Sequence, residues 1–146
     1  MQSVVFGAPR TNARTRDFVG TQIKIASARP LVVIVDDDPA IRSSLVFSLQ
    51  TEGYSVRSYA SGTELLGADL TAEASCLVVD YQLPGMNGLD LVAELRRRQV
   101  AAPAILITTH PTAAVRERAM ATGVAIIEKP LLGDALFHEI HAATHR

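Results

Sequence analysis

Side chains suited to phosphoryl chemistry stand at the ends of four separate apolar runs. They are Asp36 and Asp37 after the first run, Asp80 after the third, Thr108 at the end of the fourth and Lys129 just after the fifth. Carboxylates that lie close together repel one another unless a positive charge sits between them. Mg²⁺ prefers one or two carboxylates together with water and phosphate oxygens. The pattern therefore predicts a magnesium site that handles phosphate.

Asp80 is the candidate nucleophile of this site. Beside a divalent cation its carboxylate can attack phosphorus and form an acyl phosphate, while Lys129 and the Thr108 hydroxyl hold the transferred oxygens. The chain has only two lysines, Lys24 and Lys129, so a lysine at this point is unusual. Single residues here also have structural explanations, because an aspartate before a Pro-Gly turn is often a turn former and Asp38 fits a helix N-cap. The hypothesis depends on the strand ends meeting in one place.

Five short apolar runs, separated by segments with helical periodicity, predict a parallel sheet covered by helices on both faces. In such a sheet ligands bind beyond the carboxyl ends of the strands, which would bring the separate strand ends to one crevice. The expected strands are Leu31 to Val35, Tyr54 to Ser58, Cys76 to Val79, Ala104 to Thr108 and Val124 to Ile127.

Capping and stop residues indicate five helices. Asp38 as N-cap and Pro39 in the first turn open the first helix, which Gly53 ends. Ser61 and Glu64 have the spacing of a capping box and open the second. The other three are expected around Leu89 to Leu95, between Pro111 and Gly123, and from Leu132 to Ala143.

The composition fits one compact domain preceded by a basic arm. The chain has 146 residues, of which 48% are hydrophobic and 20% charged, as is ordinary for a single domain. Residues 1–29 hold five basic residues and one acidic residue, a formal charge of +4, which leaves −5 for residues 30–146 because the whole chain carries −1. We expect the arm to be flexible or loosely docked, although Ile23 and Ile25 alternate as in a short edge strand.

Charge and hydropathy disfavour two classes of partner. A net charge of −1 supplies no long-range field for nucleic acid, and no apolar run approaches the roughly 18 residues of a membrane span. The single cysteine, Cys76, lies in an apolar run and is expected to be a buried thiol in a reducing compartment. These features indicate a cytoplasmic protein that does not itself bind nucleic acid or membrane.

Four segments resemble the receiver domain of two-component response regulators, in particular receivers of the FixJ type. The resemblance spans about residues 30–145. The segments are Val-Ile-Val-Asp-Asp-Asp-Pro-Ala-Ile-Arg (33–42), Leu-Val-Val-Asp-Tyr-Gln-Leu-Pro-Gly-Met-Asn-Gly (77–88), Ile-Leu-Ile-Thr (105–108) and Glu-Lys-Pro (128–130). The resemblance implies a CheY-like, flavodoxin-like fold: a doubly wound (βα)5 sandwich with a central five-stranded parallel sheet in the order 2-1-3-4-5. The receiver would occupy residues 30–146.

The resemblance also implies a function in phosphorelay signalling rather than as a conventional enzyme. Asp80 would accept phosphate from a histidine kinase or a histidine phosphotransfer protein, with Thr108 and Lys129 responding to the phosphate. Mg²⁺ would be bound by Asp37, Asp80 and the Gln82 carbonyl, with Asp36 assisting through water. The Lys129-Pro130 bond would be cis. Output would pass through an unknown protein partner, and homodimer formation is left open.

Three departures from the family pattern concern the switch. Ile126 stands where the family usually has an aromatic residue whose rotation accompanies activation. Thr109 is β-branched where a small residue is preferred, so it could restrict access to Asp80. The stretch from Thr108 to Lys129 is about one residue shorter than usual, which would tighten the loop at His110 and Pro111. His110 itself is read as a loop residue rather than a catalytic base.

Other interpretations of the chain stay open at this point. It could be a receiver cut from a longer DNA-binding regulator, or a pseudo-receiver that binds partners without phosphate. A haloacid-dehalogenase-like phosphatase is suggested by Asp36 and Asp38, but such enzymes need a second acidic pair after the lysine, where only Asp134 and Glu139 remain.

Two surface features complete the expectations. Phe47 recurs at helical spacing with Ala40 and Ser43 beside the predicted buried stripe, and we interpret it as a kinase-docking anchor with core packing as the alternative. Residues 96–98, three consecutive arginines, are read as a solvated helix end.

Overall fold

The computed structural model describes residues 29–69 and 73–145. The predicted arm, including Ile23 and Ile25, lies outside these residues except for Arg29. Within the described part the strands are β2 (Leu31–Val35), β3 (Ser55–Tyr59), β4 (Ala74–Asp80), β5 (Gln82–Leu83), β6 (Met86–Asn87), β7 (Ala104–Thr108) and β8 (Ala125–Glu128). The helices are α1 (Pro39–Thr51), α2 (Gly62–Gly67), α3 (Gly88–Arg97), α4 (Ala113–Ala121) and α5 (Ala135–Thr144).

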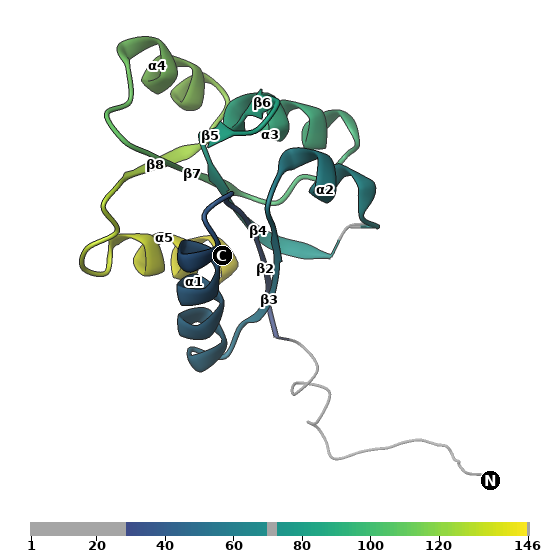
Figure 1. The fold of residues 1–146 in the computed structure, drawn as a ribbon, viewed down its shortest axis with the longest axis vertical. Helices are drawn as coiled ribbons and strands as arrows, with labels where there is room; N and C mark the ends of the chain where they lie inside the picture. Colours follow the sequence, from purple (N-terminus) through teal and green to yellow (C-terminus); the bar gives the residue numbers. More distant parts are fainter. Residues whose placement is uncertain (1–28, 70–72, 146) are drawn as a thin grey trace, which may run out of the picture.

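The central sheet has five parallel strands in the order β3-β2-β4-β7-β8. Counting these five strands along the chain, the order is 2-1-3-4-5, which confirms the predicted fold class. Helices α1 and α5 cover one face of the sheet, and α2, α3 and α4 cover the other (Figure 1). None of the helices in the described segments is long and apolar enough to cross a membrane.

Two hydrophobic cores lie on opposite faces of the sheet because successive strand residues point to opposite sides. In β2, Val32 and Ile34 pack with Leu45 and Leu49 of α1, whereas Val33 belongs to the cluster that includes residues of α2, α3 and α4. All five β2 residues are buried, which explains why this strand is apolar throughout rather than alternating. Cys76 of β4 is fully buried, as expected.

The helix signals are largely confirmed. Asp38 caps α1, since its Oδ1 accepts the Ala40 N–H at 2.9 Å. Gly53 follows that helix with φ +98°, a conformation that favours glycine. Ser61 Oγ accepts the Glu64 N–H at 3.1 Å, but the Glu64 carboxylate accepts the N–H of residue 60 rather than that of the cap residue.

The fifth helix was placed too early. It begins at Ala135 rather than Leu132, because Gly133 adopts φ +77° and the Leu132 N–H donates to Pro130 O in a turn. The second and fifth parallel strands lie one residue later than predicted, and the third extends from Ala74 to Asp80. The sequence also did not predict the antiparallel ribbon of β5 and β6, which turns at Gly85 with φ +80°.

Candidate functional site

Strand register brings the predicted site residues together. Val35 of β2 pairs with Val79 of β4, so Asp36 and Asp80 are the next residues at the same edge of the sheet. On the other side of β4, Thr108 ends β7 and its backbone carbonyl accepts the Lys129 N–H at 2.8 Å. Four strands therefore place Asp36, Asp80, Thr108 and Lys129 at one edge of the sheet, as predicted.

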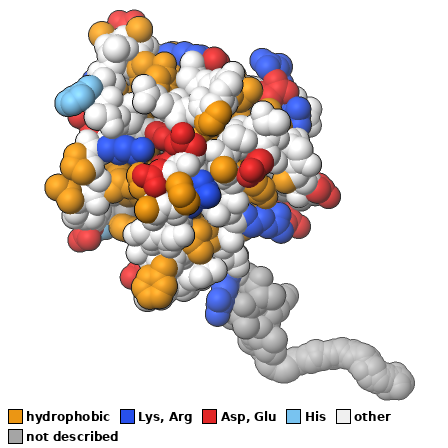
Figure 2. Space-filling view, viewed as in Figure 1, with side chains coloured by type: hydrophobic (Ala, Val, Ile, Leu, Met, Phe, Trp, Pro, Cys, Tyr) orange, Lys and Arg blue, Asp and Glu red, His pale blue; other side chains and the backbone are white. Residues whose placement is uncertain are grey.

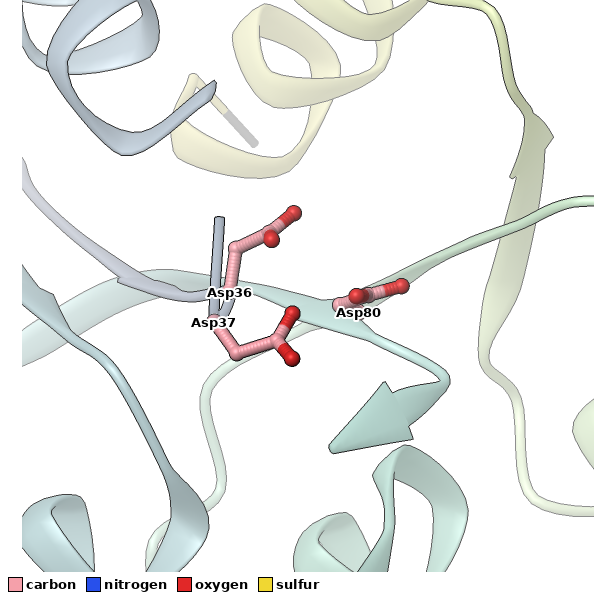
Figure 3. Close-up of side chains that lie close together, drawn as sticks. All are labelled: Asp36, Asp37 and Asp80. Atoms are coloured by element: carbon pink, nitrogen blue, oxygen red, sulfur yellow. The ribbon is translucent and has the colours of Figure 1, made fainter. Parts of the chain in front are cut away.

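Asp36, Asp37 and Asp80 form an acidic cluster. One oxygen from each carboxylate lies within 4.8 Å of the others, and the three side chains point toward a common space (Figure 3). Asp36 is 1% exposed and Asp80 is 6% exposed, whereas Asp37 is exposed. In space-filling view red acidic side chains gather at the centre of this face, with a blue basic side chain nearby (Figure 2).

One carboxylate oxygen in this cluster is left without a hydrogen bond. Asp36 Oδ1 accepts the Asp38 N–H at 2.9 Å, but Asp36 Oδ2 is buried and has no hydrogen-bond partner. A buried anionic oxygen of this kind is costly unless a positive charge compensates it. The residues present therefore fit a hard divalent cation, which prefers oxygen ligands.

Among the residues that the structure describes, Lys129 is the cation that pairs with these carboxylates. Its Nζ lies 3.4 Å from Asp80 Oδ1 and 3.6 Å from Asp36 Oδ2, and its side chain is largely buried. The Lys129-Pro130 peptide bond is cis, as the resemblance implies. Lys129 thus reaches the two buried carboxylates, but one ammonium group cannot neutralise three carboxylates.

The pKa of Asp80 reflects this excess of negative charge. Burial of the carboxyl group raises the pKa above its ordinary value, and the negative charge of Asp36 raises it further. Attraction to Lys129 and a hydrogen bond from the Gln82 backbone N–H oppose the rise without reversing it. A cation bound beside Asp80 would therefore stabilise the charged form of its carboxylate.

The remaining predicted residues lie close to this cluster. Thr108 is buried at the carboxyl end of β7, and Gln82 begins β5 with an exposed side chain. Gln82 contacts the site through its backbone N–H, which donates a hydrogen bond to the Asp80 carboxylate. Its carbonyl as a metal ligand stays a prediction.

The sequence analysis did not identify two residues that support the site. Arg42 Nη1 donates to the Asp36 carbonyl at 2.7 Å and so ties α1 to residues 36–38, which we call the acidic loop. A Cβ on Gly88 would stand 2.5 Å from Asp80 O, so only glycine lets α3 begin this close to Asp80. Both residues fall within the segments of the resemblance, but neither contact could be read from residue spacing.

Comparison with protein families finds one matching model, the response regulator receiver domain, over residues 32–141. Nodulation protein W of Bradyrhizobium diazoefficiens is 37% identical over 122 residues, covering 83% of this chain and 54% of that protein. The transcriptional regulatory protein FixJ of Azorhizobium caulinodans is 34% identical over 116 residues, covering 79% and 55%. The chain therefore spans about half the length of these curated relatives.

Two solved structures that resemble this chain are also response regulator proteins. A CheY-like response regulator receiver domain protein from Methanospirillum hungatei is 26% identical with a TM-score of 0.74, covering 81% of this chain and 95% of that one. The response regulator protein TrrA of Thermotoga maritima, solved in complex with Mg²⁺ and BeF, is 27% identical with a TM-score of 0.66, covering 78% and 98%.

Proposed function

Since the chain belongs to the response regulator receiver domain family, a family of signalling proteins rather than conventional enzymes, we propose that Asp80 is its phosphoacceptor. The observation that carries this assignment is the position of Asp80: a buried carboxylate, 3.4 Å from Lys129 Nζ, at a strand end shared with Asp36 and Asp37. Of the three carboxylates, Asp80 is the one on the central strand β4, between the acidic loop and Thr108. The donor is a phosphohistidine of a histidine kinase or histidine phosphotransfer protein.

The transfer follows from these positions. A carboxylate oxygen of Asp80 attacks phosphorus and forms an acyl phosphate, while the phosphorus–nitrogen bond to histidine breaks and the imidazole leaves with the electron pair. Lys129 already contacts one Asp80 oxygen, so its ammonium group is placed to bind a phosphoryl oxygen once Asp80 is phosphorylated. The Thr108 hydroxyl binds a second. In this way the chain assists its own phosphorylation.

Magnesium is the cofactor that the donor set suits. The carboxylates of Asp37 and Asp80 and the Gln82 carbonyl would bind the ion, and Asp36 would hold one of its waters. When bound, the ion neutralises charge on the transferring phosphoryl group. The Asp36 oxygen that has no hydrogen bond and the Mg²⁺–BeF complex of the Thermotoga relative support this proposal.

Intact mass measurement tests the phosphoacceptor. The protein is incubated with Mg²⁺ and a small phosphodonor such as acetyl phosphate, and we expect a mass gain of one phosphoryl group. Asp80→Asn should show no gain, whereas Asp134→Asn, a matched change at the exposed start of α5, should gain it as the parent does. Uptake by Asp80→Asn would show that another residue accepts the phosphate. No uptake by the folded parent, with any candidate kinase, would favour the pseudo-receiver interpretation.

Magnesium is expected to bind weakly, with millimolar-range affinity, because few protein ligands hold it and one of them is exposed. Titration with Mg²⁺ while amide shifts are recorded checks this. The largest shifts should occur at Asp37 and Asp80 and should be lost in Asp80→Ala. Shifts that persist unchanged in that variant would show that the ion binds elsewhere.

We further propose that the kinase binds at α1. Phe47 is 73% exposed, which excludes the core-packing interpretation of its ring. A groove of about 490 Å³ runs between α1 and the segment after β8, and it is lined by Ser44, Leu131 and the site residue Lys129 among others. A partner helix that contacts α1 would therefore also reach the entrance of the site.

Phe47→Ala is expected to slow phosphotransfer from the kinase several-fold, because an exposed aromatic anchor contributes to binding rather than to folding. Phosphorylation by a small donor and the melting temperature should change little. Met120→Ala is the matched control, since Met120 is 82% exposed on α4, on the opposite face of the sheet. Equal slowing by both variants would argue against a docking site at α1.

The output of the chain is proposed to be a protein partner in the cytoplasm. The FixJ relative, named a transcriptional regulatory protein, is about twice as long as the region that it shares with this chain, so the activity in its name belongs to that whole protein. Buried Cys76 suits a reducing compartment.

A further inference from the structure

Two histidines stand one helical turn apart at the carboxyl end of α5. His141 lies in the last turn and His145 is the C-cap, and both side chains are exposed. Their rings stack with centroids 4.0 Å apart and an interplanar angle of 22°. We propose that this pair is a binding site for a late first-row divalent cation such as Zn²⁺, separate from the acidic cluster.

The hydrogen bonds of His145 leave one of its ring nitrogens free to bind metal. His145 Nδ1 lies 3.0 Å from the His141 carbonyl oxygen, which can only accept, so Nδ1 carries the proton. Nε2 of the neutral ring then presents a lone pair. Histidines that bind metal commonly have their other ring nitrogen fixed in this way by a carbonyl or carboxylate.

Thr144 and Tyr54 hold His145 in place. Thr144 Oγ1 lies 3.0 Å from His145 Nδ1 and 2.9 Å from the Ile140 carbonyl, to which it donates. The hydroxyl of buried Tyr54 lies 3.3 Å from Thr144 Oγ1, and the Tyr54 ring meets the His145 ring edge-on at 6.5 Å. The first ligand is therefore tied to the helix and to the start of β3.

His141 supplies the second ligand from the same side of the helix. Histidines at i and i+4 on one helical face form a known zinc-binding arrangement. The stacked arrangement does not itself hold an ion, because the lone pair of each ring nitrogen lies in the plane of its ring. The His141 ring must therefore rotate out of the stack to share an ion with His145. Exposure of both side chains leaves room for this rotation and for water in the other positions. The carboxyl end of a helix also favours positive charge.

The donor atoms of the histidine pair determine which metal ions it would bind. Imidazole nitrogen suits Zn²⁺, Ni²⁺ and Cu²⁺, whereas Mg²⁺ prefers the oxygens of the acidic cluster. The two proposed sites also lie toward opposite ends of α5, because Lys129 precedes that helix and the histidine pair stands at its carboxyl end. Each should therefore be measurable while the other is occupied or removed.

The test is titration of the whole chain with Zn²⁺ in excess Mg²⁺, followed through the histidine ring resonances. We expect shifts at His141 and His145, and a loss of affinity of at least about tenfold in His141→Ala or His145→Ala. His138→Ala is the matched control, because His138 is exposed on the same helix outside the stacked pair, and it should bind as the parent does.

A second variant tests the support of His145. Thr144→Val keeps both histidines but removes the hydroxyl that contacts His145 Nδ1, and we expect about a tenfold loss of Zn²⁺ affinity. Equal Zn²⁺ binding by the parent and the His141→Ala/His145→Ala double variant would overturn the proposal. So would shifts confined to His110 or His138. Neither result depends on whether Asp80 accepts phosphate.

Discussion

At neutral pH the Asp80→Asn variant is expected to unfold at a higher temperature than the parent protein. The variant removes a buried negative charge that lies within 4.8 Å of two others. It also loses the attraction between Asp80 and Lys129, but burial and Asp36 outweigh that attraction, since the pKa of Asp80 is raised. We expect a gain of about 1 kcal/mol, which is on the order of 4 °C in Tm for a domain of this size.

The pH dependence follows from the direction of the pKa shift. An acid whose folded-state pKa is raised binds more protons in the folded state than in the unfolded state between the two pKa values. Parent stability therefore falls as pH rises from the unfolded value, near 3.8, through the folded pKa of Asp80. Asparagine does not titrate, so the advantage of the variant should be greatest at neutral pH and should vanish as the pH approaches 3.8.

Thermal unfolding of parent and variant across this pH range checks the prediction, with Asp134→Asn as the control. Saturating Mg²⁺ should raise the Tm of the parent, because an ion that binds only the folded state stabilises it, and should raise that of Asp80→Asn less. An advantage that is the same at every pH would show that lost repulsion at Asp80 is not its cause.

The site could be predicted because its residues are fixed by topology rather than by fine geometry. Once apolar runs alternate with helices, a parallel sheet follows, and the ends of its strands must share one edge. Asp36, Asp80, Thr108 and Lys129 were therefore located correctly even though two strands were placed one residue early. A shift of one residue at a strand boundary leaves the edge of the sheet where it is.

Features that depend on the orientation of a helix, the reach of a side chain or the backbone conformation of a loop were not predictable in this way. Whether Phe47 is exposed depends on the angle at which α1 crosses the sheet. Its helical spacing was consistent both with an exposed anchor and with a ring packed in the core. The contact of Arg42 with the Asp36 carbonyl depends on a long flexible side chain. The start of α5 depends on the positive φ of Gly133, which overrides the apolar pattern of the preceding leucines.

Phosphorylation of Asp80 is expected to alter the loop that follows β7 more than the side chain of Ile126. Thr108 is 4% exposed at the end of β7, while Thr109 and His110 beyond it are exposed. A phosphoryl group brings acceptor oxygens to this edge, and drawing the Thr108 hydroxyl toward them leaves space beneath the loop. Ile126 is half-buried, branched and packed against the core, so it cannot swing into that space as an aromatic ring could.

The contacts around α4 favour movement there. Arg116 pairs with Glu128 at 2.6 Å and Arg118 pairs with Asp90 at 2.9 Å, but all four side chains are largely exposed. Exposed ion pairs contribute little stability, typically about 0–1 kcal/mol. The helix is anchored instead by buried Val115 and Ala119, so the loop before it can shift without breaking the core.

Beryllofluoride, which mimics the phosphoryl group, tests this with Mg²⁺ present. Amide shifts should be large over residues 108–118 in the parent. Thr108→Val has nearly the same shape without the hydroxyl, and it should still bind beryllofluoride at Asp80 while the loop shifts become much smaller. The phosphoryl group can shift the equilibrium between two loop conformations only by as much as its interaction energy differs between them. We therefore expect a graded shift in their populations. Loop shifts of full size in Thr108→Val would show that another group transmits the signal, and a silent loop in the parent would mean that phosphate is accepted without being transmitted.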